Sequence, residues 1–322
     1  MAVYTTLSAA DLADLIAAYD VGTLVSAKGI AEGVSNSNWL VETTQDRFIL
    51  TMYEARVAVA DLPFFLDLLD HLAGKGSPVP RTIHDRDGAS FRMVRGKAVA
   101  LIEFLPGVSV DEPSAAQARA VGAALAGLHR NGGDFRGQRA NAMALPAWRD
   151  LFDRCGPAGL ASIDAALPAL VARELEELAH DWPADLPRTV IHADLFPDNV
   201  LLLGDRVSGL IDFYFACTDQ AAYDLAVTHA AWCFGRGGDF RPDVAAALMA
   251  GYCAARPLSA AERTALPVLA RGAALRFLAT RAYDWLHTPA DALVTRKDPL
   301  DFARRLVFYR ESAAAAFAAA AA

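Results

Sequence analysis

The sequence predicts an α+β protein with a small antiparallel-sheet lobe, a short hinge and a larger, mainly helical lobe. Residues 23–28, 39–43 and 48–53 have the apolar, β-branched and aromatic composition of strands, whereas the chain beyond residue 108 is dominated by helical patterns. Between these regions, residues 103–107 form an extended segment closed by Pro106 and Gly107. We therefore expect an N-terminal lobe over residues 1–103, a hinge over 104–107 and a C-terminal lobe over 108–322.

Composition excludes several classes of protein. Of the 322 residues, 54% are hydrophobic, which supports a sizeable core, and the net charge of −8 argues against a nucleic-acid-binding surface. No apolar stretch approaches the roughly 18 residues that a membrane helix needs, and the N-terminus lacks the pattern of a signal peptide. The four cysteines are widely spaced, as expected of reduced thiols. A cytoplasmic enzyme with a small-molecule substrate is the leading class.

The N-terminal lobe is expected to contain two helices and a sheet. Ser8 and Asp11 form the capping-box pattern that begins a helix over 9–19, and Pro63 suits the first turn of a second helix reaching residue 72. The strand at 23–28 precedes a hairpin of 39–43 and 48–53. Two further strands, at 91–94 and 98–104, flank a turn at Gly96.

The C-terminal lobe is expected to be helical around one hairpin. Ser114 and Gln117 cap a helix over 115–130. Further helices are predicted at 167–180, 221–234, 242–254, 260–286 and 299–317, with Pro267 a candidate break in the longest. The hairpin comprises 200–203 and 207–211.

The residues that carry chemistry surround this hairpin. Asn199 precedes its first strand and Asp212 follows its second, so antiparallel pairing brings the two side by side. Carboxylate and amide oxygens suit Mg²⁺, which keeps several waters and bridges substrate phosphates. Asp194 and His192 lie in the loop that leads into the hairpin. Any one of the four is compatible with an ordinary polar turn, but all four at these spacings favour a catalytic site.

A second polar segment lies between the first two predicted strands. It contains Gly33, Ser35, Asn36 and Ser37, and its backbone N–H groups could cover the phosphates of a nucleotide. Clusters of this composition are also common in plain turns. The sequence has no Walker-type phosphate loop.

These motifs together resemble the aminoglycoside-phosphotransferase branch of the protein-kinase-like fold. The resemblance rests on the loop from Asp194 to Asn199, on Ile211-Asp212-Phe213, and on Tyr223-Asp224-Leu225-Ala226. The Asp-Phe-Gly and Ala-Pro-Glu motifs of protein kinases are absent after residue 212. Within the branch the chain is most similar to the homoserine kinases, over 28–38, 61–66, 190–219 and 270–286.

The resemblance implies an activity and a set of roles. It implies transfer of the γ-phosphoryl group of ATP to the side-chain hydroxyl of L-homoserine, a step of threonine biosynthesis. Asp194 would orient and deprotonate that hydroxyl, His192 would orient the loop, and Asn199 and Asp212 would hold Mg²⁺. ATP would lie between the lobes, with adenine against the backbone of residues Glu103, Phe104 and Leu105.

One expected feature of the fold is missing. Thr51 stands where kinase-like folds usually carry a lysine on the third strand. Of the four lysines, Lys28 alone borders the candidate phosphate loop, so we hypothesise that it supplies the cation for ATP. An exposed lysine at a strand end is the equally weighted alternative.

The sequence indicates less clearly which residues bind the acceptor. A zwitterionic amino acid needs a cation for its carboxylate and an acceptor for its ammonium group. Arg276, Arg281 and Asp284 share one predicted helix and could supply both, although solvated helix charges are the commoner explanation. Tyr214 and Tyr223 flank Asp212 and either line the site or pack.

Two alternative functions stay open. The same fold could phosphorylate choline, methylthioribose or an aminoglycoside, but the sequence shows neither an aromatic cage nor a large acidic patch. A catalytically silent nucleotide-binding protein is supported only by the missing lysine.

Overall fold

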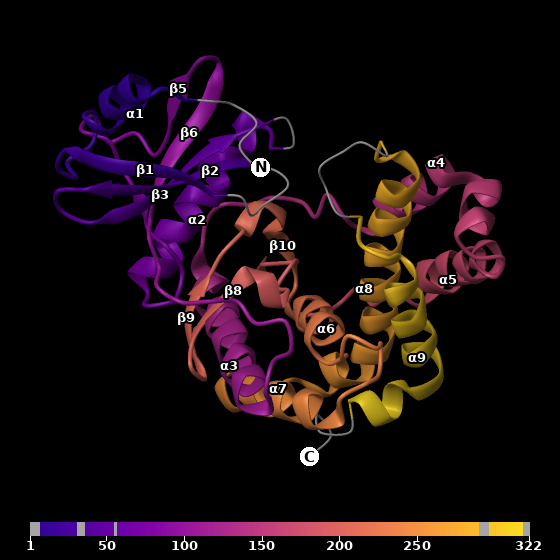
Figure 1. The fold of residues 1–322 in the computed structure, drawn as a ribbon. Helices are drawn as coiled ribbons and strands as arrows, with labels where there is room; N and C mark the ends of the chain where they lie inside the picture. Colours follow the sequence, from indigo (N-terminus) through magenta and orange to yellow (C-terminus); the bar gives the residue numbers. More distant parts are fainter. Residues whose placement is uncertain (1–6, 31–35, 55–56, 290–295, 318–322) are drawn as a thin grey trace. The chain divides into compact units, whose positions relative to one another are not determined.

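The computed structural model describes residues 7–30, 36–54, 57–289 and 296–317, and it divides into two compact units, Met1–Pro106 and Gly107–Ala322 (Figure 1). The first unit is built on one antiparallel sheet and the second is mainly helical, which confirms the predicted α+β class. In the part of the chain that is described, no helix has the length and apolarity needed to cross a bilayer.

The sheet of the first unit has six strands in the order β1-β2-β3-β6-β4, with β5 also paired to β6. Every pair is antiparallel. The strands are β1 (Leu24–Ile30), β2 (Asn36–Thr43), β3 (Arg47–Tyr53), β4 (Thr82–Ile83), β5 (Arg92–Val94) and β6 (Lys97–Glu103).

One face of this sheet is covered by α1 (Ala9–Ile16). The predicted capping box forms, because the Asp11 N–H donates to Ser8 Oγ and the Ser8 N–H donates back to the Asp11 carboxylate. The apolar stripe of α1 then packs against every second residue of the central strands, including Trp39 and Leu50. The second helix, α2 (Leu62–Gly74), packs beside β4.

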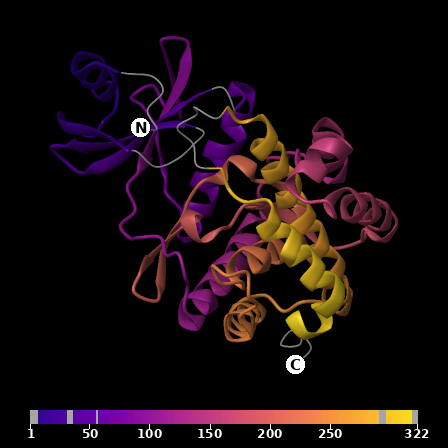
Figure 2. The ribbon, with the colours of Figure 1, turned by 45° about the vertical axis from the view of Figure 1, so that its right-hand side comes forward.

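The second unit contains the remaining helices (Figure 2). They are α3 (Ala115–Asn131), α4 (Leu145–Ile163), α5 (Leu167–Asp181), α6 (Ala221–Trp232), α7 (Pro242–Ala255), α8 (Ala260–His287) and α9 (Leu300–Ala316). Helices α3 and α7 lie in close contact because each presents a glycine. A Cβ on Gly122 would fall 2.1 Å from the Leu248 carbonyl oxygen, and one on Gly251 would fall 2.0 Å from that of Arg119.

Two small antiparallel sheets lie among these helices and carry the predicted chemistry. One pairs β7 (Arg188–Ile191) with β10 (Cys217–Gln220), and the other is the predicted hairpin of β8 (Val200–Leu203) and β9 (Arg206–Leu210). Short 3₁₀ turns at Pro197–Asn199 and Phe213–Phe215 flank the hairpin. The segment that carries the site residues therefore runs from the end of β7, through the β8–β9 hairpin, to the start of β10.

The structure corrects several expected elements. Helix α1 ends at Ile16 and not at residue 19, and α8 continues through Pro267 without a break. Helix α4 was not predicted because Gly156, at φ 66°, and Pro157 interrupt its pattern with a kink. Strands β4, β7 and β10 were not predicted, because each is short and, unlike β5 and β8, pairs with a strand that does not follow it directly in the chain.

Candidate active site

The loop that begins at His192 is held at its backbone by α6. Asp224, in the first turn of α6, is fully buried, and its two carboxylate oxygens accept the N–H groups of His192 and Ala193, each at 2.7 Å. Burial alone would raise the pKa of the Asp224 carboxyl, but the hydrogen bond that His129 Nε2 donates at 3.0 Å contributes to lowering that pKa. An ionised Asp224 therefore anchors the peptide that precedes Asp194.

His192 links the two halves of the site. Its Nε2 lies 2.9 Å from the Ile211 carbonyl oxygen, which only accepts hydrogen bonds, so this nitrogen carries the proton. Its Nδ1 then accepts the Asp194 N–H at 3.3 Å. Burial lowers the pKa of His192, which agrees with a neutral ring. The ring thus fixes Asp194 relative to the strand that ends beside Asp212.

Asn199 and Asp212 lie at neighbouring ends of the β8–β9 hairpin, in line with the expected antiparallel geometry. The Ile211 N–H donates to the Asn199 carbonyl oxygen at 3.0 Å, one residue before Asp212. Asn199 Nδ2 donates to the Asp194 backbone oxygen at 2.8 Å and lies 3.4 Å from its carboxylate. Asp212 itself has a left-handed backbone, with φ 66° and ψ 60°.

The site concentrates negative charge. Burial raises the pKa of the Asp194 carboxyl to about 7; the Arg276 guanidinium opposes this rise, and the Asp212 and Asp198 carboxylates add to it. Burial and Asp198 likewise raise the pKa of Asp212 to about 6, although Asp212 keeps an exposed surface. Carboxylates crowded in this way favour a bound cation, which would restore their ionised forms.

Asn199 and Asp212 fit a magnesium ion that takes its other ligands from water and from the phosphates of the substrate. Both amide protons of Asn199 point to Asp194, and its Oδ1 accepts no hydrogen bond from the described residues. One amide oxygen and one exposed carboxylate leave the remaining positions of an octahedral ion to water and phosphate. No group of three His, Cys, Asp or Glu side chains within the described residues could hold a metal by itself.

The sheet of the first unit places Lys28 on the same face as Thr51. In the strand register Lys28 pairs with Leu40 and Leu40 with Ile49, two residues before Thr51, so all four side chains share a face. This is the face opposite to the core beneath α1. Lys28 is exposed, and Thr51 is buried with its Oγ1 donating to Asn38 Oδ1 at 2.8 Å. A neutral Thr–Asn pair therefore replaces the expected lysine.

The other expected nucleotide contacts are placed less favourably. Gly33 and Ser35 lie outside the described residues. Ser37 is buried on the α1 side of the sheet, where its hydroxyl donates to Glu54 at 2.7 Å, so its side chain does not share the face of Lys28. Asn36 is also buried, and its Oδ1 accepts the Glu54 N–H at 3.4 Å.

The residues expected to meet adenine lie at the end of β6 and directly after it. The Glu103 N–H donates to the Arg81 carbonyl oxygen at 2.9 Å, and its carboxylate accepts the Arg81 N–H at 3.1 Å, so both groups are engaged. The guanidinium of Arg47 lies 4.9 Å from the centre of the Phe104 ring. Leu105 follows just before the boundary of the unit.

The structure separates the residues expected to clamp the acceptor. Arg276 is 2% exposed, and Tyr223 is buried against Trp148 and Trp182, which is poor placement for direct substrate contact. Arg281 is partly buried and donates to the Asp298 carbonyl oxygen at 3.0 Å. Asp284 is exposed on α8, and Tyr214 is half-buried in the turn after Asp212.

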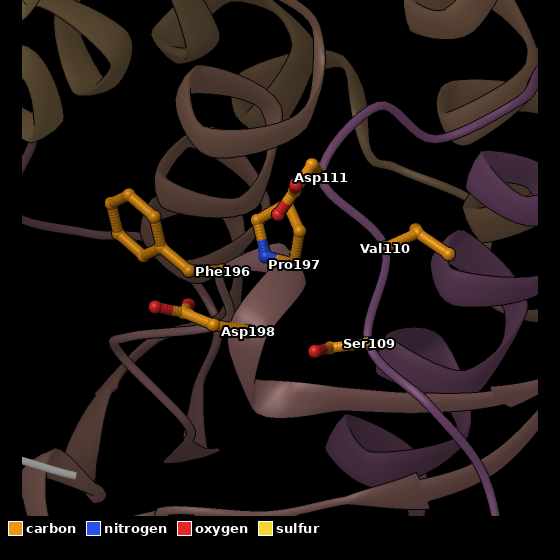
Figure 3. Close-up of a pocket in the computed structure, with 6 residues that line it drawn as sticks. All are labelled: Ser109, Val110, Asp111, Phe196, Pro197 and Asp198. Carbon is orange, nitrogen blue, oxygen red and sulfur yellow. The ribbon is translucent and has the colours of Figure 1, made fainter. Parts of the chain in front are cut away.

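Sequence reasoning missed a cavity beside the catalytic loop (Figure 3). It has a volume of about 190 Å³ and is lined by Ser109, Val110, Asp111, Phe196, Pro197 and Asp198. At its edge Lys297 Nζ lies 3.3 Å from the Asp198 carboxylate, and both side chains are more than half exposed. No sequence signal could have joined residues 99 positions apart, because the contact depends on how α8 and α9 are packed.

Comparison with known proteins agrees with this geometry. Residues 26–258 match the model of the phosphotransferase enzyme family. The chain is 55% identical over 318 residues to a homoserine kinase of Azorhizobium caulinodans, covering 98% of each chain. It is 53% identical over 315 residues to a homoserine kinase of Methylobacterium radiotolerans, covering 97% of each.

A solved structure shares the fold at low identity. The crystal structure of a spectinomycin phosphotransferase in complex with ADP and spectinomycin superimposes with a TM-score of 0.69, at 15% identity, over 98% of this chain and 99% of that one. The chain belongs to the phosphotransferase enzyme family. The two curated relatives described above are homoserine kinases.

Proposed function

We propose that this chain transfers the γ-phosphoryl group of ATP to the side-chain hydroxyl of L-homoserine, giving O-phospho-L-homoserine for threonine biosynthesis. The observation that carries the proposal is the identity of more than half the residues with curated homoserine kinases over nearly the full length of both chains. The proposed enzyme acts on a small molecule, and the proposal includes a cytoplasmic location, as expected for a step of amino-acid biosynthesis.

The proposed roles divide among four side chains. Asp194 orients the acceptor hydroxyl and takes its proton as the oxygen attacks the γ-phosphorus. A cation bound beside Asp194 favours the ionised carboxylate, which is the form that accepts the proton. Asn199 and Asp212 hold Mg²⁺, which neutralises charge on the ATP phosphates when bound. His192 keeps these groups in register and transfers no proton, since both of its nitrogens are engaged with backbone groups.

The nucleotide contacts are proposed from the first unit. Lys28 provides the cation for the phosphates, supported by its exposure and by the face it shares with Thr51. The backbone at Gly33, Ser35 and Asn36 covers the phosphates, and that of Phe104 and Leu105 meets adenine. Neither the Ser37 hydroxyl nor the Glu103 N–H is required, since each already has a partner.

The acceptor contacts are proposed at the edge of the cavity. Lys297 and Asp198 form an exposed ion pair there, and Asp198 is close enough to influence both Asp194 and Asp212. Such a pair matches a zwitterionic amino acid, whose carboxylate and ammonium group can each replace one partner. Burial lowers the pKa of Arg281, and the Asp198 carboxylate is among the charges that oppose this. Arg281 keeps its predicted role as a second cation near the acceptor.

The test is release of ADP from Mg·ATP with L-homoserine, choline, methylthioribose and an aminoglycoside as parallel acceptors. We expect turnover with homoserine in the range of roughly 1–100 per second. Turnover with another acceptor alone would keep the fold but overturn the assigned substrate. Binding of ATP without turnover on any acceptor would support a silent nucleotide-binding protein.

A further inference from the structure

The residue before Asp194 has an unfavourable backbone. Ala193 has φ 63°, a left-handed conformation that is unfavourable for a residue with a Cβ. The conformation persists only where its surroundings impose it. On the N–H side of Ala193, the Asp224 carboxylate supplies one restraint.

The second restraint comes from α8. Arg276 Nη1 donates to the Ala193 carbonyl oxygen, so the two polar groups of this single residue are held by opposite charges from two different helices. The guanidinium lies 4.6 Å from the centre of the Phe277 ring and 5.3 Å from that of Phe215. These two rings limit the directions in which it can move.

Burial of the Arg276 guanidinium costs more free energy than burial of an apolar side chain at the same position would. Its side chain is 2% exposed, its Nε has no hydrogen-bond partner, and it forms no ion pair with any described carboxylate. A buried guanidinium that is bonded to no carboxylate is destabilising, and an apolar side chain of similar size would avoid that cost. The charge acts at the catalytic loop in two ways: the guanidinium donates a hydrogen bond to the Ala193 carbonyl oxygen, and it opposes the rise in the pKa of Asp194.

We propose that Arg276 is a positioning residue, which holds the Ala193 peptide in its left-handed conformation and thereby aims the Asp194 carboxylate at the acceptor. Without this hydrogen bond, the Ala193 peptide relaxes toward an ordinary conformation and Asp194 rotates away. Arg276 reaches no substrate itself, so its loss lowers kcat and leaves the apparent affinities for ATP and homoserine nearly unchanged. This inference rests on the catalytic role proposed for Asp194.

The experiment is a double-mutant cycle between positions 276 and 193 in the full chain. Arg276→Met is expected to lower kcat roughly 100-fold, since a misplacement of about 1 Å at a reacting group costs that much. Both KM values stay within about threefold of the original. Arg276→Lys, which keeps one charged donor, recovers part of the loss. In an Ala193→Gly background the same Arg276 substitution costs at least about fivefold less, because glycine tolerates the left-handed conformation without a restraint.

Arg271→Met is the matched control. Arg271 is a mostly buried arginine on the same helix, but it pairs with Glu174 and Glu177 on α5 and does not contact the catalytic loop. Its loss should lower the melting temperature while kcat of the folded enzyme stays within about twofold. If Arg276→Met does not fold, the cycle is run with Arg276→Lys.

Two results would overturn the proposal. The fold-losses in kcat of the two single variants at positions 276 and 193 could multiply to give the loss of the double variant, which would mean that the positions are not coupled. The loss in kcat of Arg276→Met could also match that of Arg271→Met. Asp194→Asn is measured in parallel. Full activity in that variant would refute the proposed base, whereas the coupling between positions 193 and 276 is measured independently of that result.

Discussion

At the scale of single residues, the candidate site is defined by backbone conformations as much as by side chains. Ala193 and Asp212 both have left-handed φ angles. Ala193 directly precedes the proposed base, Asp194, and Asp212 is itself a proposed Mg²⁺ ligand. The structure imposes both conformations through buried hydrogen bonds, among them that of His192 to the Ile211 carbonyl oxygen. The strain is therefore concentrated where the geometry of the reacting groups has to be fixed.

Lys28→Ala tests the proposed phosphate contact at this scale. Removal of a hydrogen bond to a charged group costs about 1.5–3 kcal/mol, so the KM for ATP should rise roughly tenfold or more while the KM for homoserine is little changed. Steady-state kinetics with each substrate varied measures both values. Lys75→Ala, at an exposed helix end, is the control. An unchanged KM for ATP in Lys28→Ala would return Lys28 to an ordinary surface lysine.

At the scale of elements, local signals were sufficient where a segment carries its own pattern. The hairpin around residues 204–206 and the capping boxes of α1 and α3 follow from residues close together in the chain. The antiparallel hairpin also predicted correctly that Asn199 and Asp212 lie side by side. The strands β7 and β10 were not predictable, because each is short and its partner lies far along the chain, whereas the equally short β8 pairs with the strand that follows it.

The acceptor side shows the same limit. Arg276, Arg281 and Asp284 fall within one helix pattern, but the sequence does not show which face of a largely buried helix meets the catalytic loop. Packing of α8 against α4, α6 and α9 decides this, and it buries Arg276 while Asp284 stays exposed. The cavity edge at Asp198 and Lys297 arises from that packing too.

The contact of α3 with α7 gives a prediction at the element scale. A helical Gly→Ala substitution usually stabilises a protein by up to about 1 kcal/mol. At Gly122 the added methyl group meets the backbone of α7, so Gly122→Ala should instead destabilise by about 1–3 kcal/mol or more. Urea unfolding measures the change. Gly127→Ala on the same helix, with open space around its Cβ position, should be neutral or stabilising. Equal effects at the two positions would contradict the close packing.

At the scale of the whole molecule, buried titratable groups set the response to acid. Burial lowers the pKa of His229 to about 3, in a cluster with Tyr309 and Phe317. The pKa of His192 is also lowered by burial, whereas the exposed His84 and His180 have raised pKa values through their aspartate partners. Protonation of His192 and His229 therefore favours unfolding as the pH falls.

The sign of this effect follows from where the proton binds. The folded chain keeps His229 neutral down to about pH 3, but the unfolded chain protonates it near pH 6.5, so acid favours unfolding below that pH. Between pH 6.5 and 5.5, the free energy of unfolding should fall by about 1 kcal/mol more in the original protein than in His229→Phe. Urea titrations at the two pH values test this, with His180→Gln as a surface control. A pH dependence identical in His229→Phe and the original protein would contradict the assignment.

The central claim is that Asp194 prepares the homoserine hydroxyl for attack on ATP. The most direct measurement is the kcat of homoserine-dependent ADP release in Asp194→Asn, beside the original chain, with folding of both checked by circular dichroism. General-base catalysis contributes typically ~10²–10⁴-fold, so we predict a fall in kcat of that size with the KM for ATP nearly unchanged. A variant that retains turnover within about threefold of the original would contradict the account.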